Sequence, residues 1–251
     1  MRNFSQNYSA KIKAKAVILK DNAILFTEDK MHSLKTFLES STKKFQIDKN
    51  TINGYDYRII AVKAIEMTTN PVQKMKAQKN EAELEHLKYA FAKTDKAVNA
   101  IREYIDSNDN ISEFDIAIQL AKEFKNNGAL GLSFSSIVAK DKNSALAHYS
   151  KSSKDGSLIL IDCGGYFEGG LATDITRVFV KGRPSELQIK IYTTVLKAFL
   201  KAYNYVKEHP QTTLTGYEID KSVHEFFDGQ NLDGFVFNHG LGHGIGINVH
   251  E

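Results

Sequence analysis

The stretch that decides the fold reads Leu-Ile-Leu-Ile-Asp-Cys-Gly-Gly at residues 158–165 and Thr-Asp-Ile-Thr-Arg at residues 173–177. An apolar strand delivers Asp162 directly before a glycine pair, and Asp174 follows twelve residues later. A hairpin that returns through the glycines at residues 169–170 would bring the two aspartates together. Adjacent carboxylates repel each other unless a proton or a cation lies between them, and divalent cations prefer hard oxygen ligands. The pair is a candidate metal site, although aspartates also form ordinary turns at strand ends.

Three histidines and four glycines lie within residues 239–251. Histidine is the commonest metal ligand, and glycine lets a backbone approach a ligand closely. His239 and His243 stand four residues apart, but the Gly-Leu-Gly between them argues against a stable helix that presents both to one ion. Two interpretations stay open: one histidine binds a metal while the other serves a substrate, or the segment is a glycine-rich loop with structural histidines.

His148 is isolated in a small apolar patch, Ala-Leu-Ala-His-Tyr-Ser, at residues 145–150. Considered alone, such a histidine is more often a structural group than a ligand. It becomes a candidate site residue only in combination with the aspartate and histidine segments.

The chain divides at about residues 70–71, where Asn-Pro precedes a change from short strands to long helices. The elements expected before this point are strands at residues 14–19 and 23–26, a helix at residues 33–38, and further strands at residues 44–47 and 57–62. Some seventy residues offer little surface for an independent α/β core. Residues 1–69 are therefore interpreted as the C-terminal part of a preceding α/β domain.

Beyond the division, apolar residues recur at three- and four-residue steps and predict a long helix over residues 81–107. The other elements expected are a helix ending near residue 125, strands over residues 132–138, 157–162 and 178–180, a helix over residues 186–206 and a helix from residue 215. Two helices, a group of strands and two more helices indicate an α+β fold for residues 70–251.

Composition narrows the class of protein. The 251 residues are 42% apolar and 25% charged, which is ordinary for a globular protein, and the net charge of +3 comes from scattered lysines. Such scatter is typical of a solvated surface, so we expect no nucleic-acid partner. The sequence has no apolar span for a membrane and no signal peptide. Cys163, the sole cysteine, excludes an internal disulfide, and a cytoplasmic location fits.

Taken together, the motifs resemble the signature segments of the metallo-aminopeptidase family with the pita-bread fold, and specifically its aminopeptidase P (Xaa-Pro aminopeptidase) branch. The segments that carry the resemblance are residues 131–134, 147–150, 161–164, 173–177, 239–246 and 249–251. The resemblance is close over residues 70–251. Residues 1–69 are similar only loosely, as the end of a creatinase-like N-terminal domain.

The resemblance implies a role for each candidate residue. Three residues correspond to ligands of a centre with two divalent ions: Asp162, Asp174 and His243. Asp174 is implied to bridge both ions, for which Mn²⁺ is expected, with Zn²⁺ or Co²⁺ as alternatives. Three histidines correspond to groups that line the substrate site and stabilise the transition state: His148, His239 and His250.

Two features depart from the family pattern. The aspartates stand one residue further apart than in the family, so we expect an extra residue at the hairpin tip. The other two ligands, one of them the general base, are glutamates on strands that follow the Val-His-Glu of residues 249–251. Residues 1–251 hold no counterpart, because Glu251 matches a residue that is not a ligand. We therefore expect the chain to be a fragment of a longer three-domain enzyme, with weak or no binding of the two metal ions and no useful activity by itself.

The reaction that the resemblance implies is hydrolysis of the bond between an N-terminal residue and a following proline, by a hydroxide held between two divalent ions. The expected partners are peptides with proline at the second position, and family members often form homodimers. Two alternatives remain: a prolidase that acts on Xaa-Pro dipeptides, and a non-catalytic pita-bread module that binds peptides or proteins. Retention of every ligand expected within these residues favours an enzyme.

Overall fold

The computed structural model describes residues 13–146, 152–153, 155–210 and 214–251. Contacts within the chain divide it into two compact units, Met1–Leu84 and Glu85–Glu251. The domain boundary predicted near residue 70 stays a prediction.

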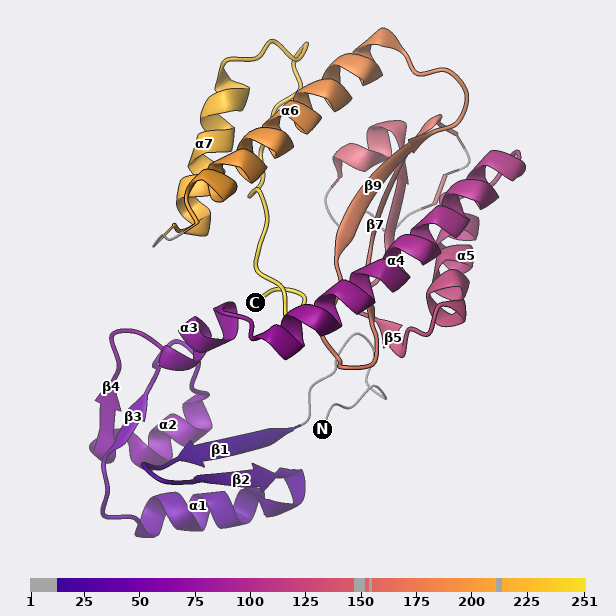
Figure 1. The fold of residues 1–251 in the computed structure, drawn as a ribbon. Helices are drawn as coiled ribbons and strands as arrows, with labels where there is room; N and C mark the ends of the chain where they lie inside the picture. Colours follow the sequence, from indigo (N-terminus) through magenta and orange to yellow (C-terminus); the bar gives the residue numbers. More distant parts are fainter. Residues whose placement is uncertain (1–12, 147–151, 154, 211–213) are drawn as a thin grey trace. The chain divides into compact units, whose positions relative to one another are not determined.

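The first unit is a small α/β arrangement of short elements (Figure 1). Its elements are β1 (Ala14–Ile18), β2 (Ala23–Thr27), α1 (Met31–Ser40), β3 (Phe45–Ile47), α2 (Gly54–Ile60), β4 (Ala64–Glu66) and α3 (Pro71–Ala77). Strands β1 and β2 pair as an antiparallel hairpin, whereas β3 and β4 are parallel and α2 forms the crossover between them. The buried core residues come from both pairs and both helices: Phe26, Leu34, Leu38, Ile47 and Ile60.

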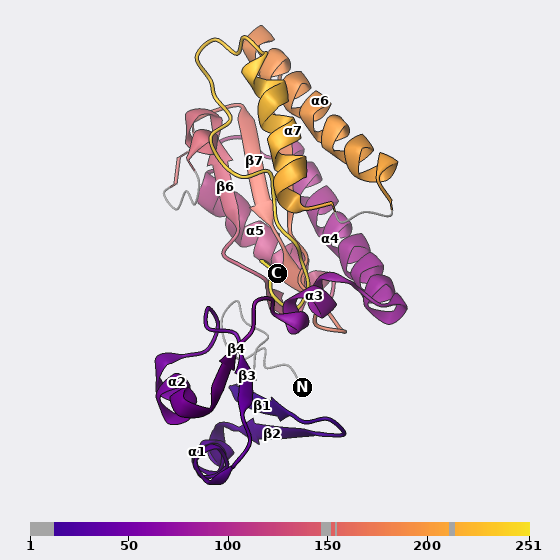
Figure 2. The ribbon, with the colours of Figure 1, turned by 90° about the vertical axis from the view of Figure 1, so that its left-hand side faces the viewer.

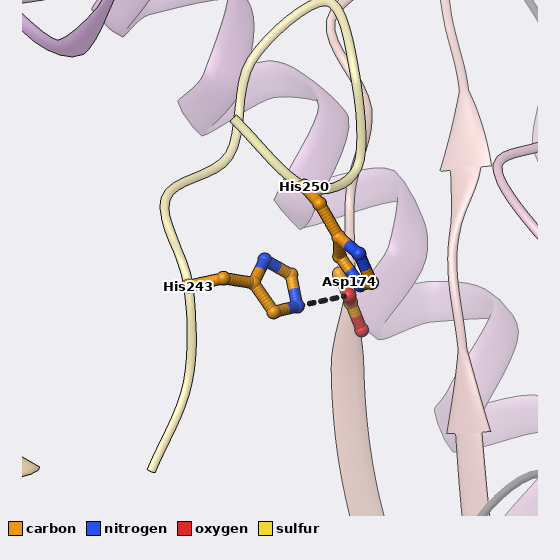
Figure 3. Close-up of side chains that lie close together, drawn as sticks. All are labelled: Asp174, His243 and His250. Carbon is orange, nitrogen blue, oxygen red and sulfur yellow. Dashed lines mark ion pairs between the residues drawn. The ribbon is translucent and has the colours of Figure 1, made fainter. Parts of the chain in front are cut away.

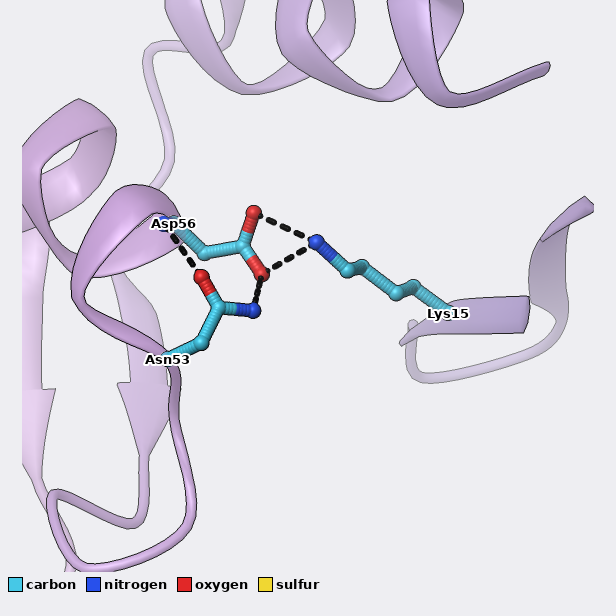
Figure 4. A network of polar contacts seen from close by, with 3 residues as sticks. All are labelled: Lys15, Asn53 and Asp56. Carbon is cyan, nitrogen blue, oxygen red and sulfur yellow. Dashed lines mark hydrogen bonds and ion pairs between the residues drawn. The ribbon is translucent and has the colours of Figure 1, made fainter. Parts of the chain in front are cut away.

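A polar network ties the hairpin to α2 (Figure 4). The Lys15 ammonium on β1 donates to both carboxylate oxygens of Asp56, at 2.8 and 2.6 Å. Asn53 caps α2, since its side-chain oxygen accepts the Asp56 backbone N–H at 2.9 Å and its amide donates to the Asp56 carboxylate. The ion pair therefore also fixes the start of the helix.

This cap overturns one prediction. Residues 57–62 are expected to be a strand from their apolar and β-branched side chains, but residues 54–60 form α2 and residues 61–63 a short 3₁₀ turn. A local cap and burial of Ile60 in the core outweigh intrinsic β propensity. The strands predicted at residues 14–19, 23–26 and 44–47 and the helix at residues 33–38 are confirmed.

The second unit combines long helices with antiparallel strands (Figures 1 and 2). Its elements are α4 (Glu81–Ser107), α5 (Glu113–Asn126), β5 (Gly131–Leu132), β6 (Ile137–Lys140), β7 (Leu158–Cys163), β8 (Gly165–Tyr166), β9 (Ile175–Val180), α6 (Glu186–Glu208) and α7 (Gly216–Asp228). The run predicted as one strand over residues 132–138 is two strands, β5 and β6, which belong to different sheets.

Helices α4 and α5 pack against the sheet formed by β6, β7 and β9 and enclose the main core. The most deeply buried residues of this core are Ala97, Ile101 and Ile105 of α4, Ile116, Leu120 and Phe124 of α5, and Ile159, Ile161 and Cys163 of β7. Alternate residues of β7 point into this core, which leaves Asp162 on the opposite face. Helices α6 and α7 pack together through Ala198, Ala202 and Val223. None of the helices within the described residues is long and apolar enough to cross a membrane.

The hairpin from β7 to β9 keeps one register throughout. Leu158 pairs with Val180 at one end, Cys163 pairs with Ile175, and Tyr166 bridges Ala172 near the tip. The chain reverses at residues 167–171, where Gly169 and Gly170 have φ angles of 92° and 66°. Glycine adopts this left-handed region without steric cost. The hairpin expected through this glycine pair is confirmed, and any extra residue lies at its tip.

Close packing beneath the hairpin depends on Gly164. A Cβ atom there would lie 1.8 Å from the Thr173 carbonyl oxygen and 2.5 Å from the Ser133 hydroxyl. The first contact is with backbone and cannot be relieved by rotating a side chain. The glycine after Cys163 thus lets the returning strand approach closely enough to place Asp174 beside Asp162.

We predict that Gly164→Ala lowers the free energy of unfolding by at least about 3 kcal/mol, because strands β7 and β9 must separate to admit the methyl group. Urea denaturation followed by circular dichroism measures the change. Gly216→Ala is the matched control, since a Cβ at Gly216 meets nothing within 4 Å. A loss below about 1 kcal/mol in Gly164→Ala would contradict this account of the hairpin.

Candidate metal site

The two aspartates project from the same face of the hairpin. Asp162 pairs with Thr176 across the strands, and Asp174 lies two residues before Thr176. Residues two apart on a strand share a face, so the carboxyl groups are diagonal neighbours. The Thr176 hydroxyl donates to Asp162 Oδ1 at 3.1 Å and orients that carboxyl.

The carboxyl groups share a hydrogen bond, which perturbs both pKa values. Burial, followed by the charge of Asp174, raises the pKa of Asp162 to about 6. Burial also raises the pKa of Asp174, opposed by His243 and by the hydrogen bond from Asp162. Below about pH 6 the pair therefore holds a proton between its two carboxyl groups. This arrangement is one of the two ways to relieve repulsion between close carboxylates, and a cation is the other.

Cys163 takes no part in this chemistry. Its side chain is fully buried in the core, and burial together with the charges of Asp162 and Asp174 raises the pKa of the thiol to about 12. A thiol with such a pKa stays protonated at neutral pH, so it is neither a nucleophile nor a ready metal ligand.

Two histidines of the glycine-rich segment approach Asp174 (Figure 3). His243 Nε2 lies 3.3 Å from Asp174 Oδ2, and the ring of His250 lies 4.0 Å from that of His243, centroid to centroid. One ligand atom from each of Asp174, His243 and His250 falls within 4.8 Å of the others. The sequence predicted Asp174 and His243 as ligands and His250 as a substrate residue, whereas the geometry groups all three.

The tautomer of His243 follows from its second ring nitrogen. Nδ1 lies 3.0 Å from the carbonyl oxygen of Gly244. A carbonyl only accepts, so Nδ1 carries a hydrogen, and Nε2 is the ring nitrogen that faces Asp174 and is placed to bind a metal. Metal-bound histidines characteristically use the other ring nitrogen in this way.

Backbone hydrogen bonds seat the segment on the hairpin. The Ala172 N–H donates to the Gly246 carbonyl at 2.7 Å, and the Tyr166 hydroxyl donates to the Ile247 carbonyl at 3.1 Å. The segment also folds back on itself, because the Glu251 N–H donates to the Gly244 carbonyl at 3.0 Å. These bonds bring His243 and His250 to the aspartates although about seventy residues separate them in sequence.

The glycines at positions 244 and 246 are required by space. A Cβ at Gly244 would lie 2.3 Å from the Glu251 carbonyl oxygen, and one at Gly246 would lie 1.6 Å from the Glu251 carboxylate. The two glycines therefore allow the tight loop that brings His243 and His250 together. Of the two interpretations open from sequence, the geometry favours grouped histidines over a merely structural loop.

His239 stands apart from this group. The ring of His239 packs edge-on against Phe237, 4.7 Å between centroids, and its Nδ1 lies 2.8 Å from the Gly240 carbonyl. It is not among the described residues that cluster with Asp174. His148 lies outside the residues that the structure describes.

A buried hydroxyl network supports Asp174 from below, and sequence reasoning missed it. Thr173 Oγ1 lies 2.8 Å from Thr94 Oγ1 of α4 and accepts the Gly165 N–H, while the Ser133 hydroxyl donates to the Thr173 carbonyl. Thr94 and Thr173 are fully buried. The sign of this network in the sequence is a threonine, Thr94, among the apolar positions of an amphipathic helix.

The donor set fits a divalent cation. A carboxylate oxygen of Asp174 and imidazole nitrogens of His243 and His250 converge from the hairpin and the terminal segment, and the Asp162 carboxyl is hydrogen-bonded to Asp174. Mixed oxygen and nitrogen ligands suit Mn²⁺, Zn²⁺ and Co²⁺. The shared proton occupies the place where a cation would balance the same charges.

Known proteins resemble this chain in sequence and in fold. It is 32% identical over 240 residues to a probable Xaa-Pro aminopeptidase P of Leptosphaeria maculans, covering 90% of this chain and 37% of that protein. It is 34% identical over 193 residues to the Xaa-Pro dipeptidase of Pyrococcus horikoshii, covering 76% of this chain and 53% of that protein. The crystal structure of the prolidase from P. horikoshii matches with a TM-score of 0.78 and 27% identity, covering 95% of this chain and 73% of the other.

The chain spans between about a third and a little over half the length of the curated relatives it matches. The predicted α+β pita-bread fold is confirmed by the likeness to solved structures. The model of metallopeptidase family M24 matches residues 85–251. This chain belongs to metallopeptidase family M24.

Proposed function

We propose that this chain carries metal ligands and substrate-binding residues of a metal-dependent peptidase that cleaves next to proline. The observation that carries the proposal is that the carboxyl groups of Asp162 and Asp174 lie on one face of the hairpin and that the His243 ring of the terminal segment approaches Asp174. A carboxylate pair with an adjacent, correctly oriented imidazole is a donor set for hard divalent ions, and family membership supports peptide hydrolysis as the reaction.

In this proposal Asp162, Asp174 and His243 would hold divalent metal, and Mn²⁺ is the expected metal. Bound divalent ions supply Lewis-acid charge that lowers the pKa of water and polarises a scissile carbonyl. His250 lies at the same group and would donate to the oxyanion as it forms, while His239 and His148 would contact the substrate. Asp162 and Asp174 are held rigidly because they lie on a paired hairpin.

Two substrate classes are supported to a similar degree. Xaa-Pro aminopeptidase is favoured by the likeness of sequence motifs and by the relative from L. maculans. Prolidase, which acts on Xaa-Pro dipeptides, is favoured by the relative and the solved structure from P. horikoshii. We propose the aminopeptidase as the first assignment, with the peptide substrate carrying proline at its second position and with a cytoplasmic site of action.

The assignment is tested at the protein's full natural length, with Mn²⁺ added, on an Xaa-Pro-Xaa tripeptide and an Xaa-Pro dipeptide. The proposal predicts turnover of the tripeptide that is lost with EDTA, and His243→Ala lowers kcat/KM by at least about 100-fold because a ligand is removed. His209→Ala, at the end of α6, is the control. Cleavage of the dipeptide alone would indicate the prolidase, and cleavage of neither peptide would contradict both.

The shared proton predicts how stability of the metal-free protein depends on pH. The pKa of Asp162 in the folded chain, about 6, lies above its ordinary value of 3.8. Folding therefore favours the protonated form, so this contribution to stability is complete below about pH 4 and is lost as pH rises through 6. Asp162→Asn keeps a hydrogen-bond donor without the charge.

In EDTA, we expect Asp162→Asn to be more stable than the unaltered chain at pH 7.5, by about 1 to 2 kcal/mol after partial solvent screening, and to match it at pH 4. Thermal unfolding at both pH values measures the difference. Asp228→Asn, an exposed aspartate of α7, should show no such trend. Equal stability of Asp162→Asn and the unaltered chain at pH 7.5 would show that the pKa of Asp162 is not raised in the folded chain.

A further inference from the structure

Residues 237–243 run alongside helix α7 before they reach the aspartates, and the backbone there has few steric restrictions. Gly240 and Gly242 flank Leu241, and a Cβ atom at either glycine would meet nothing within 4 Å. Packing therefore does not set the backbone at these two positions. Glycine also loses more conformational freedom on ordering than other residues, so a fixed path requires an anchor.

Asp220 provides a contact of the required kind. Its Oδ1 accepts the Leu241 N–H at 2.7 Å, twenty-one residues away in sequence. Leu241 stands midway between His239 and His243, two residues from each. The other carboxylate oxygen of Asp220 lies 3.6 Å from His224 Nε2, one helical turn further along α7. A hydrogen bond to a charged acceptor is stronger than one between neutral groups.

Apolar contacts from the same helix hold the segment immediately before this point. The ring of Phe237 stacks on Phe227, 4.9 Å between centroids at 22°, and lies 4.8 Å from the ring of His224. Leu241 itself packs against the cluster between α6 and α7. Helix α7 thus holds the segment through ring stacking at Phe237 and through the hydrogen bond from the Leu241 N–H to Asp220. His243 follows Leu241 by two residues.

We propose that Asp220 is a positioning residue of the metal site, which sets the path of the segment that carries His239 and His243. This inference rests on the proposed function, because it gives Asp220 a role towards the ligand His243. Asp220 contacts neither metal nor substrate. It restricts the backbone conformations of residues 240–242, so that His243 is held in position to bind the metal. Mutation of supporting groups of this type commonly lowers metal affinity by about 10- to 100-fold.

Three variants separate positioning from general stability. Asp220→Ala removes the acceptor. Asp220→Asn keeps a carbonyl oxygen that accepts from Leu241 and so should restore the anchor without the charge. Glu225→Ala is the matched control, because Glu225 lies on the same exposed stretch of α7 and its ion pair with Lys221 is 62% exposed on both sides.

The first measurement is hydrogen exchange of the Leu241 amide in the metal-free chain. We expect exchange at least about tenfold faster in Asp220→Ala than in the unaltered chain, since one charge-assisted hydrogen bond is lost. Asp220→Asn and Glu225→Ala should exchange like the unaltered chain. Equal exchange in Asp220→Ala and the unaltered chain would overturn the proposal.

The second measurement is titration of the protein at its full natural length, and of its variants, with Mn²⁺ alone. We expect Asp220→Ala to raise the Kd by about tenfold or more, with Asp220→Asn within about threefold of the unaltered chain. Unchanged affinity in Asp220→Ala would overturn the proposal while leaving the proposed function intact. Failure of the unaltered protein at its full natural length to take up Mn²⁺ would count against the proposed function, and the amide exchange would still decide whether Asp220 holds the segment.

Discussion

The site depends on one cross-strand relationship: the register that pairs Asp162 with Thr176 and so places Asp174 diagonally beside Asp162. A slip of one residue would turn one carboxyl into the core, where an unpaired charge is costly. The register is held by apolar pairs along β7 and β9, by the close approach at Gly164 and by the buried hydroxyls around Thr173. Core packing therefore determines the position of polar groups that lie outside the core.

The terminal segment, residues 239–251, adds two histidines to this arrangement although it forms no helix or strand within the described residues. Hydrogen bonds from the Ala172 N–H and the Tyr166 hydroxyl and the folded loop at Gly244 bring His243 and His250 to Asp174. Donors that come from distant parts of a chain make a metal site cooperative with folding, since ligands scattered in the unfolded state do not bind together. Binding of a cation and ordering of the segment should accordingly be coupled.

Much of this could be predicted from the sequence because the relevant signals are local. The helices of the second unit follow from apolar periodicity and capping residues, and the hairpin from two apolar runs around glycines. Residues 57–62 were predicted wrongly, because the cap at Asn53 decided the structure against β propensity. The contacts of Asp220 with Leu241 and of Thr94 with Thr173 could not be predicted, since they join positions 21 and 79 residues apart and arise only from packing. The grouping of His250 with His243 likewise depends on a loop path that no periodicity specifies.

The central claim is that Asp162, Asp174 and His243 together hold a divalent cation. Anomalous diffraction from crystals of the protein at its full natural length, grown with Mn²⁺, tests the claim directly, because the scattering locates the ion without assumptions about its ligands. The account predicts a peak in contact with the carboxylates of Asp162 and Asp174 and with Nε2 of His243. A peak elsewhere, or none at Mn²⁺ concentrations that change the hydrogen exchange of the terminal segment, would contradict it.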